Sequence, residues 1–278
     1  PVRTIVPEGR TTTLDITAWG TVQPAREVDL RPALTGRLVE IDEAMVPGGL
    51  LAQGMVAAKI DNRDYRFAVE QALATLETAK FNLEVEEGRG RVARRDWETL
   101  GDEITIDPAG TRMALREPHR AERTAAVASA QSAVDKAVLA LMRTELTVPF
   151  NAMVQSESAE VGQMVSSATT LATLIGTDEY RVEIGVPLDD LARLGLHEGA
   201  ADTRPAVIGL SIGDGARVEY GGHVVGLTGS VDAVGRMARV LVEVPSPLEQ
   251  SATRAVPLLL GAYVEVRLEG PPIEDVME

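Results

Sequence analysis

The feature that most constrains this chain is a proline-free stretch, residues 63–100, rich in Ala, Leu, Glu and Arg, which favour helix. Val69, Leu73, Leu76 and Leu83 recur in it at helical spacing and predict one apolar stripe. A helix of this length extends roughly 57 Å at about 1.5 Å per residue. It cannot fold alone as a globule and needs a partner helix.

A second helix is predicted to begin at Glu117-Pro118, because proline suits the first helical turn, and to end near Leu146. Its stripe alternates steps of three and four and consists of Val127, Ala130, Val134, Ala137 and Leu141. The segment 107–110, Asp-Pro-Ala-Gly, predicts a turn between the helices. We expect Asp61 or Asn62 to cap the first helix and Gly101 to end it.

The segments on either side of these helices have the alternation and glycine punctuation of β-strands. Residues 48–60 and 162–174 share one motif: a glycine, then an apolar residue three positions on, a small residue six on and an aliphatic residue twelve on. Upstream, residues 35–39 correspond to residues 150–154. The sequence therefore predicts two similar β halves interrupted by an antiparallel helical hairpin, with an ordinary helical bundle as the alternative.

Composition excludes several classes of function. Forty-two acidic residues against 27 basic ones give a net charge of −15, which disfavours a nucleic acid partner. The chain has no cysteine, and its only histidines, His119, His197 and His223, are far apart in sequence, so we expect no metal site. No catalytic or nucleotide-binding motif is present and no apolar run reaches the length of a membrane span, so we expect no enzyme, no cofactor and no bilayer span in this chain.

A series of short motifs carries a resemblance to a known family. They occupy residues 20–24, 28–32, 35–39, 147–154, 161–165, 180–187, 229–232 and 260–266. In this order, with a hairpin between the half-motifs, the chain resembles the periplasmic adaptor subunits (membrane fusion proteins, HlyD-like) of tripartite efflux pumps that work with transporters of the resistance-nodulation-division (RND) type.

The resemblance implies a mainly β fold with an inserted α-helical hairpin: a split lipoyl-like β-sandwich, an antiparallel coiled-coil hairpin and a β-barrel domain. We expect N-terminal strands of the barrel or of a membrane-proximal unit in residues 1–22. The lipoyl-like domain is expected in 23–61 plus 147–176, the hairpin in 62–146, the barrel in 177–270 and the start of a truncated membrane-proximal domain in 271–278.

The resemblance also implies a function and its partners. An adaptor links an inner-membrane RND-type transporter to an outer-membrane channel of the TolC type, and its copies associate into a ring, a hexamer or a trimer of dimers. It works in the Gram-negative periplasm, anchored by a segment outside this chain. Three alternatives stay open: an adaptor of an ABC-type motor, a lipoyl or biotinyl carrier using Lys59 as the nearest lysine, and a structural coiled-coil scaffold.

In the family the hairpin tip carries an Arg, a Leu four residues later and a Ser eleven residues later. Counted from Arg95, this chain has Thr at position 99, Ile at position 106 and Leu100 one place late. Only Arg95 and Leu100 are carried over as channel contacts. Trp97 is a further candidate contact, the alternative being that it packs between the helices.

Overall fold

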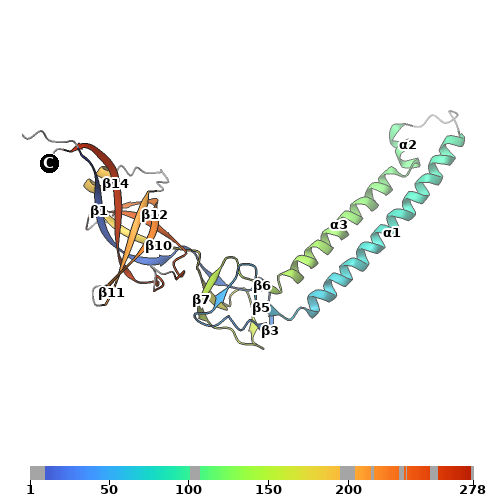
Figure 1. Cartoon of the computed structure of the whole chain (residues 1–278). Coiled ribbons are helices and arrows are strands. Elements are labelled where there is room, and N and C mark those ends of the chain that lie inside the picture. The colour runs from blue at the N-terminus through green and yellow to red at the C-terminus, as the bar shows by residue number, and fades with distance from the viewer. Residues whose placement is uncertain are drawn as a thin grey trace, which may run out of the picture.

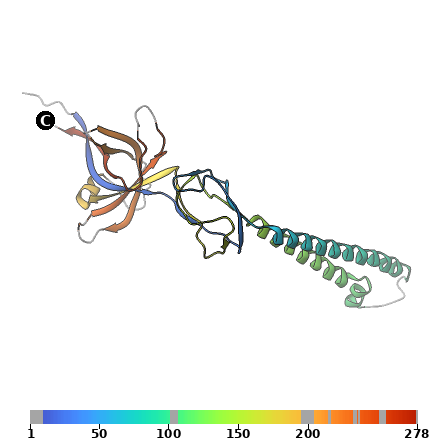
Figure 2. The same cartoon turned by 90° about the horizontal axis from the view of Figure 1, so that it is seen from below.

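The computed structural model describes residues 10–100, 107–194, 204–213, 216–231, 235, 237–250 and 256–276. Three parts follow one another along an extended molecule, with a barrel at one end, a small β-sandwich in the middle and a helical hairpin projecting from the far side (Figures 1 and 2). The hairpin therefore ends far from the barrel, and the sandwich joins the two.

The barrel is closed and has six strands. In order around it they are β1 (Arg10–Pro24), β10 (Glu179–Pro187), β13 (Met237–Pro245), β12 (Ala216–Val231), β11 (Pro205–Ile212) and β14 (Tyr263–Val276). Alternate residues point inward, as Tyr180, Val182 and Ile184 do on β10. The short helix α4 (Leu188–Leu194) packs Leu191 against this core, whereas Leu188 is exposed.

Charged side chains on the outer face of the barrel pair with one another. The side chains of Glu243 and Glu265 are 14% and 18% exposed. Arg181 reaches Glu243 across neighbouring strands at 3.4 Å, and Arg217 reaches Glu265 at 2.9 Å. The first pair joins directly opposite residues of the neighbouring strands β10 and β13, and such opposite charges support strand pairing. The second pair reaches from β12 to β14 across β11, which lies between them.

The sandwich consists of two four-stranded sheets, ordered β2-β9-β7-β4 and β6-β5-β3-β8. The strands before the hairpin are β2 (Glu27–Leu30), β3 (Gly36–Ile41), β4 (Leu50–Leu51) and β5 (Val56–Ile60). Those after it are β6 (Glu145–Thr147), β7 (Ala152–Glu157), β8 (Met164–Val165) and β9 (Ala172–Gly176). Each sheet thus takes two strands from each half of the chain.

The repeat predicted from the sequence appears in the strand orders of the two sheets. When β2 is exchanged with β6, β3 with β7, β4 with β8 and β5 with β9, the order of one sheet becomes the order of the other. The glycines that open the two motifs, Gly48 and Gly162, both have positive φ, 85° and 92°, a conformation that only glycine adopts without strain. The two halves therefore form matching turns and complete one core together.

The hairpin is inserted between β5 and β6, which pair antiparallel. Its helices are α1 (Arg63–Leu100), α2 (Pro108–Ala114) and α3 (Glu117–Met142). At the start of α1 the Asp61 carboxylate accepts a hydrogen bond from the Arg63 backbone N–H at 3.2 Å, as predicted. Tyr65 donates its hydroxyl to the Thr35 carbonyl at 3.0 Å and ties the helix to the sandwich.

Two predicted boundaries of the hairpin were wrong. Residues 107–110 do not form a plain turn, because Asp107 accepts a hydrogen bond from the Gly110 N–H at 3.0 Å and caps α2, with proline in its first turn. The second helix ends at Met142 rather than near Leu146, because residues 145–147 pair with β5 instead. Gly101, the expected end of the first helix, lies outside the described residues.

The apolar stripe of α1 also needs one correction. Leu76 is buried, and Val69 and Leu83 are half-buried, but Leu73 is 44% exposed. Ala72 and Ala79 take the facing positions instead. The stripe of α3 lies as predicted, from Val127 to Leu141.

Two tyrosines buried in the barrel give a matched test of the core. Tyr220 donates its hydroxyl to the Val256 carbonyl at 2.6 Å, whereas the buried Tyr180 hydroxyl has no partner among the described residues. We expect Tyr220→Phe to lower the free energy of unfolding by about 1–2 kcal/mol, because it leaves a carbonyl unpaired. Tyr180→Phe should leave it unchanged or raise it. Denaturant unfolding of both variants checks this, and equal losses would contradict the assignment.

Candidate functional site at the distal end of the hairpin

Near the sandwich the hairpin is held by a narrow apolar seam. Leu76 on α1 and Ala130 and Val134 on α3 are buried there, and Ala72, Ala79 and Val127 pack against them. Alanines let the two backbones approach closely, at the cost of a thin core. The seam covers only the proximal part of α3.

Farther out, the same positions carry charge. On α1 the steps of three and four that pass through Ala79 and Leu83 continue to Glu86, Gly90 and Ala93. On α3 the steps run back from Val127 to arginine at positions 123, 120 and 116. No large apolar side chain fills this part of the seam. The helices are therefore held there by charge rather than by a dry core.

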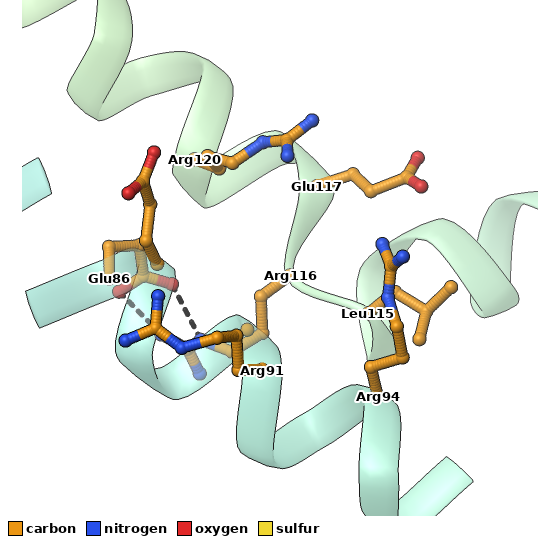
Figure 3. A pocket seen from close by; sticks show the side chains of 9 residues that line it. Glu86, Arg91, Arg94, Leu115, Arg116, Glu117 and Arg120 are labelled. Atoms are coloured by element: carbon orange, nitrogen blue, oxygen red, sulfur yellow. Dashed lines mark hydrogen bonds and ion pairs between the residues drawn. The ribbon is translucent and has the colours of Figure 1, made fainter. Parts of the chain in front are cut away.

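A bidentate ion pair joins the two helices at this point. Arg116 donates from Nε and Nη2 to the two carboxylate oxygens of Glu86, at 2.6 and 3.0 Å (Figure 3). The Glu86 side chain is only 5% exposed, and Arg89 approaches it at 3.7 Å. The hydrogen bonds from Arg116 lower the pKa of Glu86 below its ordinary value, because they favour its charged form.

Arg116 also marks the break between α2 and α3. Its backbone is left-handed, with φ 60° and ψ 22°, a conformation that costs energy for a residue with a Cβ. It is the N-cap of α3 but cannot cap the helix with its side chain, because a guanidinium has no acceptor for the N–H groups of the first turn. Its guanidinium binds Glu86 instead. Arg116 therefore both separates α2 from α3 and holds the two long helices together through its ion pair with Glu86. This ion pair is called the clamp below.

An open cavity of about 270 Å³ lies beside this clamp. Figure 3 shows Arg91 and Arg94 of α1, Arg116 just before α3 and Arg120 of α3 around it. Glu86, Glu87, Gly90, Leu115 and Glu117 complete its lining. In both overall views α2 lies beside the distal end of α1, at the end of the hairpin far from the sandwich (Figures 1 and 2).

The structure does not place the predicted contacts on one face. Arg95 is exposed, whereas Trp97 is half-buried and continues the line of Gly90 and Ala93. Two residues apart on a helix means directions about 200° apart. The side chain of Leu100 lies outside the described residues. A channel contact by Arg95, Trp97 and Leu100 stays a prediction.

The arginine cluster around Arg116 is not among the predicted site residues, although the helical spacing on α3 indicates it. The stripe of α3 was followed only through its apolar members, so it stopped at Val127. Continued toward the N-terminus at the same spacing, it passes through Arg123, Arg120 and Arg116, and the last of these pairs with Glu86 on α1. Charged residues at seam positions mark a polar contact, which a search for apolar residues passes over.

Other candidate groups have ordinary explanations. Lys59 lies within β5, and its ammonium pairs with Glu40 at 2.9 Å, so it does not sit on a turn as a carrier lysine would. His223 lies 3.7 Å from Glu243 on the barrel, and His197 lies outside the described residues. Within the described ranges, no group of three or more His, Asp or Glu side chains could hold a metal ion.

The chain was compared with known families, sequences and structures. No family model matches the sequence. The multidrug resistance protein MdtA of Yersinia enterocolitica is 25% identical to this chain over 169 residues, which cover 61% of this chain and 36% of MdtA. The match thus spans little more than a third of that relative's length.

Solved structures match over nearly the whole chain. MacA of Actinobacillus actinomycetemcomitans has a TM-score of 0.64 at 16% identity, covering 99% of this chain and 84% of MacA. A membrane fusion protein of Streptococcus pneumoniae has a TM-score of 0.59 at 12% identity, covering 92% of this chain and 99% of that protein. The expected likeness to membrane fusion proteins and the predicted fold class, mainly β with an inserted hairpin, are confirmed.

The ion pair at the clamp predicts a local dependence on pH. Because the pKa of Glu86 is lowered from 4.5, its contribution to stability is complete above about pH 4.5 and is lost as the pH falls through its lowered pKa. Glu86→Gln should remove this dependence and speed amide hydrogen exchange in residues 86–95 and 112–120. Glu84→Gln, an exposed neighbour, is the control. Unchanged exchange in Glu86→Gln would show that the clamp does not hold the helices.

Proposed function

We propose that this chain, which has the fold of the membrane fusion proteins, is a periplasmic adaptor of an efflux pump. It links an inner-membrane transporter, of the RND type, to an outer-membrane channel of the TolC type. Several copies stand side by side as a ring, a hexamer or a trimer of dimers, with the hairpins forming the wall of a conduit. The protein performs no catalysis and needs no cofactor, because sealing a conduit requires only matching surfaces.

The observation that carries this proposal is the apolar surface that the hairpin leaves uncovered. By length and composition α3 is apolar enough to cross a membrane, yet only 11% of its most apolar 18-residue stretch is buried. It runs alongside α1 alone, with no third helix of comparable length among the described residues (Figure 1). An apolar helix surface of this extent is covered by a partner when the protein works.

A second copy supplies a suitable partner. Phe67 and Phe81 of α1 are 65% and 64% exposed and lie fourteen residues apart, on one face of the helix. Val138, Leu139 and Met142 of α3 are exposed as well. Both patches lie on the same hairpin but on different helices, so α1 of one copy can pack against α3 of the next. Such a head-to-tail contact forms a ring when the rotation from one copy to the next closes.

The barrel carries a further exposed aromatic pair. Trp19 and Tyr263, on neighbouring strands β1 and β14, stack with ring centroids 5.7 Å apart and are 49% and 65% exposed. Exposed aromatic side chains are frequent in protein interfaces. We assign this face of the barrel to contact with the transporter, on the membrane side of the periplasm, where a segment outside this chain anchors the protein.

Deletion of the gene tests the proposed function. Loss of the protein should raise the accumulation of compounds that the pump exports, and the complete gene should restore export. Export that stops when the proton gradient is collapsed supports the RND-type motor, whereas export that stops only on ATP depletion assigns the chain to an ABC-type motor. Unchanged export of a broad panel of compounds, with the transporter intact, would contradict the adaptor role.

Self-association gives a prediction for the isolated protein. Phe67→Ser combined with Phe81→Ser should weaken association by roughly tenfold or more per site, since burying each ring is worth roughly 1.5–3 kcal/mol. Glu70→Ser with Glu84→Ser is the matched control, because these exposed residues have the same fourteen-residue spacing on α1. Sedimentation over a range of concentrations measures the effect. Equal association of both variants would rule out this face as the contact.

A further inference from the structure

Arginines gather in two segments of the distal hairpin, residues 86–95 and 112–123. These segments, named here the basic band, hold eight arginines and four glutamates, in a protein of net charge −15. We propose that the basic band docks an acidic helical segment of a partner protein, whose carboxylates meet Arg91, Arg94 and Arg120. This docking rests on the proposed function, because the band lies at the end that faces away from the barrel (Figure 1).

Three of the arginines are available for such a contact. Arg116 is committed to Glu86, which Arg89 also approaches. Arg91, Arg94 and Arg120 are exposed, line the same cavity and form no ion pair with another described residue. The first two stand on α1 and the third stands across the space on α3 (Figure 3). The cavity therefore presents cations from two helices toward one occupant.

The spacing of these cations suits a helix. Arg91 and Arg94 lie three residues apart, about one turn of α1. A partner helix with acidic residues three or four positions apart presents its carboxylates at the same interval. A guanidinium also accepts a carboxylate in a bidentate manner, which fixes the orientation of the pair. The N-terminus of α3 beside the cavity adds partial positive charge to this side.

Apolar side chains within the band favour a protein over a free anion. Val92 is 61% exposed and Met113 is 58% exposed, and both fall within the basic band. Arginine and methionine are enriched in protein interfaces, where apolar contact supplies area and charge supplies specificity. Exposed guanidinium groups bind single anions weakly, so several simultaneous contacts are needed.

A peptide-binding experiment tests the docking surface. The probe is a fluorescein-labelled alanine-based helical peptide of about 20 residues with glutamates three and four positions apart, and fluorescence anisotropy reports its binding to the purified chain. We expect binding that weakens with salt, and a loss of roughly tenfold or more in affinity for Arg91→Gln, Arg94→Gln and Arg120→Gln combined. A peptide with glutamine in place of glutamate should not bind.

The control variant removes the same charge from the proximal part of the hairpin. It combines Arg66→Gln, Lys136→Gln and Arg143→Gln, which are exposed and have no ion-pair partner in the described chain. Its affinity for the peptide should stay within about twofold of the unaltered chain. Equal losses in both triple variants would mean diffuse attraction and overturn the proposal, as would displacement of the peptide by inorganic phosphate at matched ionic strength.

Sedimentation of the same samples separates this inference from the proposed function. If the chain self-associates but does not bind the peptide, the docking surface is refuted while the adaptor role stands. If the chain binds the peptide but never self-associates, the ring is refuted while the basic band keeps its ligand.

Discussion

The pairing of β5 with β6 determines how the rest of the hairpin is built. The chain leaves the sandwich after Ile60 and returns at Thr144, whose carbonyl accepts a hydrogen bond from the Ile60 N–H at 2.8 Å. Because exit and return are held side by side, the segment between them has to run out and back, and its two long helices must be antiparallel. The hairpin thus projects from a fixed base, with its direction set by the sandwich.

An antiparallel pair of helices has a limited capacity for burial. Each helix turns only one stripe toward the other, and here the stripe is mostly alanine, so most apolar side chains remain outside. Aromatic residues make up 3% of the chain, yet two of its three phenylalanines are exposed on α1. Two of the few aromatic side chains of the chain thus lie on the surface of the hairpin instead of filling a core. The exposed apolar surface of the hairpin suits contact with another protein surface better than contact with water.

The seam changes character along its length, and this change gives the distal end its chemistry. Alanine and valine hold the proximal part, whereas Glu86 and Arg116 hold the distal part through a charged pair. A nearly buried carboxylate is tolerated only because both of its oxygens are paired. Arg91, Arg94 and Arg120 beside this pair are exposed and form no ion pair with another described residue. They leave the segments 86–95 and 112–123 basic in an acidic protein.

Much of the fold could be predicted from the sequence, because its strongest signals are periodic. The glycine motifs at Gly48 and Gly162 identified the two halves of the sandwich, and the helical limits at Arg63 and Glu117 followed from composition and from proline. The division of the chain into its five segments stays a prediction, although β14 continues without a break to Val276, paired with β1.

The errors have physical causes as well. The sequence predicts Leu73 in the seam because leucine is more apolar than alanine. The two helix backbones lie close together there, and this favours the smaller Ala72. The helix after Asp107 was missed because the same residues that form turns also cap helices. The ion pair of Glu86 with Arg116 joins residues thirty positions apart, and no local pattern reports it.

Disulfide cross-linking between copies tests the central claim most directly, because the chain has no cysteine of its own. Ala74→Cys lies on the α1 face that carries Phe67 and Phe81, and Leu139→Cys lies on the exposed face of α3. In cells that produce the full protein, a variant with both cysteines should form a ladder of cross-linked copies under mild oxidation, and each single variant should not. A double variant that stays monomeric while the pump exports normally would contradict the side-by-side assembly.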